Sequence, residues 1–143
     1  MAEPYYFLGS ALDLLGRTPE AVEALGQALR RDPHLAMAWY ALAQIHQRGG
    51  RAEEAARARK EFEKSRELKT RINGLRSELA KDPRNLAALI DLGKAHLEAD
   101  RPEEAIGPFG RARDLDPGNP EIEGLLVRAR DAAARKGAAA GPR

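Results

Sequence analysis

The side chains that could do chemistry in this sequence are three histidines, three serines and two pairs of adjacent glutamates. They are His34, His46, His96, Ser10, Ser65, Ser77, Glu53-Glu54 and Glu103-Glu104. A histidine can act as a general base or a metal ligand, and a nucleophilic serine needs such a base beside it. Neither His46 nor His96 shares an apolar helical face with a second histidine or a carboxylate three or four residues away, as a helical metal site would require.

Nucleotide and hydrolase motifs are also missing from the sequence. The serines lack the G-x-S-x-G turn of a nucleophile elbow, and neither a P-loop nor a G-x-G-x-x-G loop occurs. The glutamate pairs fall at expected helix starts, where a negative charge complements the helix dipole. We therefore expect a protein that is not an enzyme and that has no cofactor and no metal.

Composition narrows the class of protein further. The chain of 143 residues has no cysteine, which excludes disulfides and thiolate metal sites. Charged residues make up 32%, and no stretch approaches the roughly 20 apolar residues of a membrane span. No basic region followed by an apolar run is visible at the start, so no signal peptide is expected and the predicted location is cytoplasmic.

The only strongly basic segment lies in the middle of the chain. Residues 51–84 contain eleven Lys and Arg against seven acidic residues, while the whole chain has a net charge of +2. Glutamates 61, 63 and 67 are interleaved with the basic residues, which is typical of a solvated helix with ion pairs. Phe62 is the only aromatic residue in this segment, so the segment lacks the several aromatic side chains on which nucleic acid bases would stack. Nucleic acid is therefore not favoured as a partner.

A repeated Asp-Pro dipeptide marks the corners at which the helices that position these side chains end. Asp-Pro occurs at residues 32–33, 82–83 and 116–117, each time after an apolar helical pattern. Because proline disfavours helix in the preceding residue, three helices should end at these corners.

A longer set of residue types recurs at one spacing around these corners. The first set is Tyr5, Leu8, Gly9, Leu12, Ala21, Leu25, Ala28 and Pro33; the clearest set is Leu89, Leu92, Gly93, His96, Ala105, Phe109, Ala112 and Pro117. A further set begins with Trp39, Leu42, Ala43, His46 and Ala55. The spacing matches W-x2-L-G-x2-Y…A-x3-F…P, so the chain resembles the tetratricopeptide repeat family over about residues 2–67 and 84–117.

The resemblance implies an all-α fold in which α-helical hairpins stack into a right-handed superhelical solenoid. The small residues Gly9, Ala43 and Gly93 sit in mid-helix, where they allow another helix to approach closely. By the same pattern, His46 and His96 should pack between paired helices. The resemblance also implies a protein-interaction module that binds a peptide or a partner helix.

One interval in the repeat is too long. Consecutive prolines are 34 residues apart between Pro83 and Pro117 but 50 apart between Pro33 and Pro83. Apolar residues continue at three–four spacing through the extra segment, which predicts one long helix, with a break at Asn73-Gly74 as the alternative. The predicted organisation is two repeat units over 1–67, a long shared helix over 52–82, a third unit over 83–117, a capping helix over 118–136 and a disordered tail over 137–143.

The family resemblance places a concave groove on the first helix of each unit. The residues it places there are Tyr6, Ser10, Asp13, Met37, Tyr40, Gln44, Gln47, Arg48, Ile90 and Lys94. Tyr6 and Tyr40 are large, rigid and half polar, which suits an anchor for a bound peptide. The alternative is that one or both tyrosines pack on a neighbouring helix.

A second function from a different class is self-association. If the long helix lacks a partner helix along its second half, four large residues on one face stay uncovered: Leu68, Ile72, Leu75 and Leu79. Such a stripe would favour a homo-oligomer or a filament as the alternative to peptide binding.

Overall fold

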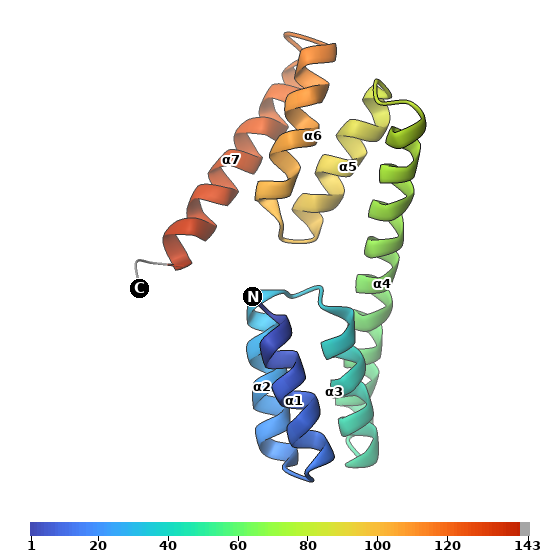
Figure 1. Cartoon of the computed structure of the whole chain (residues 1–143), viewed down its shortest axis with the longest axis vertical. Coiled ribbons are helices and arrows are strands. Elements are labelled where there is room, and N and C mark those ends of the chain that lie inside the picture. The colour runs from blue at the N-terminus through green and yellow to red at the C-terminus, as the bar shows by residue number, and fades with distance from the viewer. Residues whose placement is uncertain (141–143) are drawn as a thin grey trace. The chain divides into compact units, whose positions relative to one another are not determined.

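The computed structural model describes residues 1–140, which form seven α-helices and no β-strand (Figure 1). The helices are α1 (Glu3–Leu14), α2 (Thr18–Arg31), α3 (Ala36–Arg48), α4 (Ala52–Lys81), α5 (Leu86–Glu98), α6 (Pro102–Leu115) and α7 (Pro120–Ala140). Short turns connect them, as in stacked helical hairpins. The all-α fold predicted from the sequence is therefore confirmed.

At two of the three Asp-Pro corners, the aspartate side chain accepts a hydrogen bond from the backbone two residues further on. The Asp32 carboxylate accepts a hydrogen bond from the backbone N–H of His34 at 3.0 Å, and Asp82 accepts one from Arg84 at 3.1 Å. These are Asx-turns, which compete with the helix and help to end it. At the start of α7, the side-chain oxygen of Asn119 accepts from the backbone N–H of Glu121 at 3.0 Å, as a helix cap does.

The chain divides into two compact units at the middle of α4. Unit 1 runs from Met1 to Glu67 and holds α1, α2, α3 and the first part of α4. Unit 2 starts at Leu68 and holds the rest of α4 with α5, α6 and α7. In unit 1, α1 and α2 form an antiparallel hairpin beside α3; in unit 2, α5 and α6 form a hairpin that packs on α7 (Figure 1).

In each of these two hairpins, a side chain of the second helix packs closely against a glycine of the first helix. A Cβ placed on Gly9 would lie 2.7 Å from Cγ of Leu25 in α2, and one placed on Gly93 would lie 2.6 Å from ring atoms of Phe109 in α6. Leu25 and Phe109 are both completely buried. The two mid-helix glycines are therefore where paired helices approach too closely for a side chain.

α4 is one continuous helix of 30 residues. It passes through Asn73 and Gly74 without interruption (Figure 1), and a Cβ on Gly74 would meet no other atom within 4 Å. Nothing opposes the local helical preference at that point, so the glycine lowers helix propensity without ending the helix.

The apolar stripe on the second half of α4 is covered, which corrects the expectation that it lacks a partner. Leu68, Ile72 and Leu79 are 4–7% exposed, and Leu75 is half-buried. They share a core with residues of α5, α6 and α7, namely Ala88, Leu89, Leu92, Ala95, Ala112 and Ile122. The following hairpin packs on this half of α4 and supplies the missing partner, so these four residues form the core of unit 2 and present no free face for self-association.

The end of α7 also differs from the expected disordered tail over residues 137–143. The helix continues through Gly137 to Ala140. Three consecutive alanines follow Gly137, and alanine has the highest helix propensity of all residues, which offsets the glycine. Residues 141–143 of the expected tail lie outside the described residues.

Candidate functional site

In unit 1, an ion pair joins the predicted groove residues of α1 and α3. Arg48 of α3 donates to both carboxylate oxygens of Asp13 in α1, at 2.6 and 2.7 Å. The two helices therefore present these residues on one shared surface. Because the two charges neutralise each other, the pair leaves little net charge for a ligand.

Tyr6 and Ser10 lie on the same side of α1 and are half-buried. Tyr6 packs against the core of unit 1, and its ring lies edge-to-face with Phe7 at a centroid distance of 5.3 Å. Its exposed part is therefore smaller than that of Tyr40. Of the two tyrosines, Tyr6 fits better the alternative expected from the sequence, which is packing on a neighbouring helix instead of anchoring a peptide.

Tyr40 lies in an exposed apolar patch that spans α3 and α4. Tyr40 is 53% exposed and Met37, one turn earlier, is 55% exposed. The ring of Phe62 in α4 lies 5.5 Å from the Tyr40 ring, and the guanidinium of Arg66 lies 5.9 Å from the Phe62 ring. We call Met37, Tyr40, Phe62 and Arg66 the Tyr40 patch. It offers a rigid aromatic surface with a phenol and a cation at its edge.

The remaining predicted polar residues of α3 are exposed. Gln44 projects from the middle of the helix, and Gln47 lines a small open pocket of about 170 Å³ at the corner between α3 and α4. The other residues of that pocket are Gly50, Ala52, Ala55 and Arg59. These amides supply hydrogen-bonding groups beside the Tyr40 patch.

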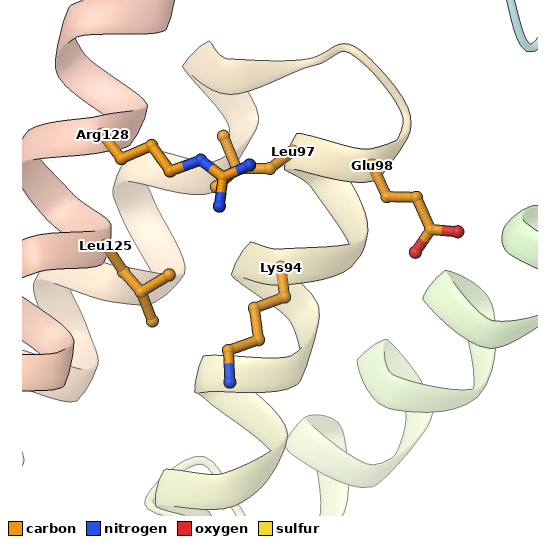
Figure 2. Close-up of a pocket in the computed structure, with 5 residues that line it drawn as sticks. All are labelled: Lys94, Leu97, Glu98, Leu125 and Arg128. Atoms are coloured by element: carbon orange, nitrogen blue, oxygen red, sulfur yellow. The ribbon is translucent and has the colours of Figure 1, made fainter.

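Unit 2 has its own concave site between α5 and α7 (Figure 2). This α5–α7 pocket has a volume of about 320 Å³ and is lined by Lys94, Leu97, Glu98, Leu125 and Arg128. Figure 2 shows the Arg128 head group reaching toward Leu97, while the Glu98 carboxylate points away from the other four residues. The pocket thus combines two leucines with two cationic side chains.

Ion pairs within the protein neutralise some of the charged side chains that line the α5–α7 pocket, and the others remain free to contact a ligand. The Lys94 ammonium donates to Glu121 of α7 at 2.9 Å, and Glu98 pairs with Arg71 of α4. No hydrogen bond or ion pair joins Arg128 to any of residues 1–140. Arg128 is therefore the unneutralised charge beside the two leucines.

The sequence predicted only part of these two surfaces. Of its two residues on α5, Lys94 lines the pocket, whereas Ile90 is half-buried and packs on the core of unit 2. Phe62, Leu125 and Arg128 were missed as surface residues. The spacing could have found the last two, because α7 begins 34 residues after α5 and so takes the place of the first helix of another unit.

His96 of α5 is buried between helices, while His46 of α3 is half-buried and accepts a hydrogen bond from Arg51 at 2.9 Å. Nδ1 of His96 lies 3.3 Å from a Glu104 carboxylate oxygen but makes no hydrogen bond. Burial lowers the pKa of His96 below its ordinary value; Glu104 opposes this shift, and the cations Arg76 and Arg101 reinforce it. His96 is a neutral packing residue at neutral pH.

This burial predicts a pH dependence of stability. The unfolded chain binds a proton on residue 96 at its ordinary pKa of 6.5, while the native chain resists protonation, so the free energy of unfolding should fall as the pH drops below about 6.5. We expect His96→Gln to be less sensitive to pH between about 7 and 5 than the wild type. Urea unfolding at a series of pH values measures this. Parallel curves for the two proteins would contradict it.

Within residues 1–140 no group of three or more His, Asp or Glu side chains is arranged to hold a metal ion. In the same part of the chain, none of the helices is both long and apolar enough to cross a bilayer.

A match to a family model identifies the family to which the repeated hairpins belong. The model described as "Tetratricopeptide repeat" matches residues 6–63 and 74–120, which is well over half of the chain. The chain belongs to the tetratricopeptide repeat family. The ten residues between the two tetratricopeptide repeat matches, 64–73, lie inside α4, where the sequence has its overlong interval.

Solved structures that match this chain include two that are described as tetratricopeptide repeat proteins. A crystal structure of MamA is 23% identical over 80% of this chain and 58% of that chain, with a TM-score of 0.42. The first repeat domain of Spaghetti (RPAP3), solved with the HSP90 peptide SRMEEVD, is 19% identical over 93% of both chains, with a TM-score of 0.42. YrrB, described as having an unusual peptide-binding site, is 15% identical over 94% of this chain and 78% of that one, with a TM-score of 0.45. No curated protein matches the sequence.

Proposed function

We propose that this tetratricopeptide repeat chain is a protein-interaction module that binds a peptide or a partner helix and carries out no catalysis. The observation that carries the proposal is the Tyr40 patch. Two large side chains, Tyr40 and Met37, are each more than half exposed on a rigid helix surface, next to the ring of Phe62. Aromatic residues held in place in this way lose little conformational entropy on binding.

Neighbouring polar groups would orient the ligand. The amides of Gln44 and Gln47 lie on the same helix as Tyr40 and can hydrogen-bond to a peptide backbone. Arg66 at the edge of the patch is paired with Glu63 at 3.7 Å, so it adds hydrogen-bond donors there but little net charge. These groups favour an extended or helical segment with one aromatic or aliphatic anchor residue.

The α5–α7 pocket supports the same function in unit 2. Leu97 and Leu125 provide an apolar floor, and Arg128, which has no ion-pair partner among residues 1–140, favours a carboxylate beside an aliphatic group. Neither surface is proposed to be catalytic. Lys94, the titratable cation of the α5–α7 pocket that could otherwise act as an acid or base, is held in an ion pair with Glu121.

Replacing Tyr40 by alanine should remove the main anchor. Peptides selected from a random phage library on the immobilised wild-type chain should bind Tyr40→Ala about 30-fold more weakly, because a central aromatic anchor contributes about 2 kcal/mol or more. Affinities are measured by fluorescence anisotropy. Circular dichroism should be unchanged, since the Tyr40 side chain is 53% exposed.

The matched control is Val127→Ala on α7, whose side chain is 54% exposed but lies outside the Tyr40 patch. The same peptides should bind this variant like the wild type. Selected peptides that bind Tyr40→Ala and the wild type equally well would contradict the proposal.

A further inference from the structure

α1 is apolar on two faces, and only one of them packs inside unit 1. The buried face is formed by Gly9 and Leu12, which contact α2. The other face carries large side chains that remain in solvent: Phe7 is 64% exposed, Leu8 51%, Leu14 89% and Leu15 71%. With Ala11 between them, these residues recur at three–four spacing along α1 and its C-cap residue Leu15, and form one stripe about 120° wide. We call Phe7, Leu8, Ala11, Leu14 and Leu15 the α1 stripe.

In the other first helices, the positions equivalent to the middle of the stripe are helix-packing positions. Adding the repeat of 34 residues to Leu8 and Ala11 leads to Leu42 and Ile45 of α3, which are 8% and 2% exposed and belong to the core of unit 1. The matching residue of α5, Leu92, is 6% exposed and buried in unit 2. The middle of the α1 stripe, Leu8 and Ala11, therefore lies at a helix-packing position of the repeat, whereas the positions of Leu14 and Leu15 are exposed at the end of α3, where they hold Arg48 and Gly49.

We propose that the α1 stripe is covered by the same stripe of a second copy of this chain, so that the protein forms a two-fold symmetric dimer. This inference goes beyond the proposed peptide binding and uses a different surface. A two-fold interface must be self-complementary. The α1 stripe meets that condition, because pairs of large residues flank the small Ala11 symmetrically, three and four positions away on each side.

An antiparallel arrangement of the two helices follows from this symmetry. It places Phe7 and Leu8 of one copy against Leu15 and Leu14 of the other, with Ala11 facing Ala11 at the two-fold axis. A small residue at the axis lets the two backbones approach closely, as Gly9 does inside the unit. The stripe contains no charged residue, and antiparallel helix dipoles attract, so nothing in it opposes the pairing.

The size of the stripe sets the expected strength. The four large side chains expose on the order of 400–550 Å² when a whole side chain is taken as roughly 150–200 Å². Two copies would bury about 1,000 Å² together, which lies at the low end for specific interfaces. We therefore expect half of the chains to be dimeric at a concentration of roughly 1–100 µM.

Sedimentation equilibrium of the full chain tests the proposal. Between about 1 and 300 µM, the apparent mass should rise from 15.6 kDa toward twice that value. Leu15→Glu should weaken dimerisation at least tenfold, because each dimer would place two unpaired carboxylates in the apolar contact. Val127→Glu is the matched control, since it places the same charge at another exposed apolar residue, and it should dimerise like the wild type.

A cysteine cross-link tests the geometry. The chain has no cysteine of its own, so Ala11→Cys introduces a single thiol at the proposed axis. Under mild oxidation it should form a disulfide-linked dimer at concentrations where Ala134→Cys, an exposed position on α7, stays monomeric. Three results would overturn the proposal: a 15.6 kDa monomer at every concentration, equal dimerisation by Leu15→Glu, or equal cross-linking at the two cysteine positions.

Discussion

Replacing Phe109 by alanine should lower the free energy of unfolding of unit 2 by about 3–5 kcal/mol. Phe109 is the largest completely buried side chain of the described residues, and it packs from α6 onto Gly93 of α5 and into a cluster with Leu126 of α7. Truncation would leave a cavity that three helices border. The backbones cannot collapse into it without breaking the close contact between α5 and α6, so the cost should lie near the upper end of the range.

Hydrogen exchange followed by mass spectrometry can localise this destabilisation. Phe109→Ala should reduce the protection of amides in α5, α6 and α7 more than that of amides in α1 and α2, because Phe109 belongs to a core cluster of unit 2. Phe7→Ala is the matched control, since that ring is 64% exposed, and at low protein concentration it should change stability by less than about 0.5 kcal/mol. A comparable effect of the two substitutions would contradict this assignment of the core.

Gly93→Ala should also destabilise unit 2, although alanine is the better helix former. A Cβ at this position would lie 2.6 Å from Phe109 ring atoms, and the ring is completely buried and has no room to move. Overpacking of this kind costs about 1–3 kcal/mol, and alanine offsets roughly 1 kcal/mol of that cost through its helix propensity. Because the Cβ would meet a buried ring inside van der Waals distance, we take the upper part of that range and expect a net loss of about 1–2 kcal/mol, measured by urea unfolding.

Gly107 of α6 supplies the control with the opposite sign. A Cβ on Gly107 would meet no atom within 4 Å, so Gly107→Ala should raise stability by about 0.5–1 kcal/mol. If both alanine variants stabilised the chain, the close approach of α5 and α6 at Gly93 would be disproved.

The sequence by itself determined the helical hairpins and where most of them begin and end. Asp-Pro corners, prolines in the first helical turn and three–four apolar spacing are local signals, and each acts within a few residues. The sequence also predicted a close helix contact at Gly9 and Gly93, because a glycine in mid-helix is costly unless another helix lies against it. The continuous α4 was predicted in the same way from apolar spacing through residues 62–82, with a break at Gly74 as the alternative.

Only the tertiary structure decided which apolar faces are covered. Leu68 and Leu79 are leucines on an apolar helical stripe, as are Leu8 and Leu15, yet the first pair is buried under the following hairpin and the second pair is in solvent. Periodicity shows that a face is apolar but does not show what packs on it, because the covering helix lies elsewhere in the chain. For the same reason, the sequence did not show that Phe62 lies beside Tyr40, because this contact depends on how α3 packs against α4.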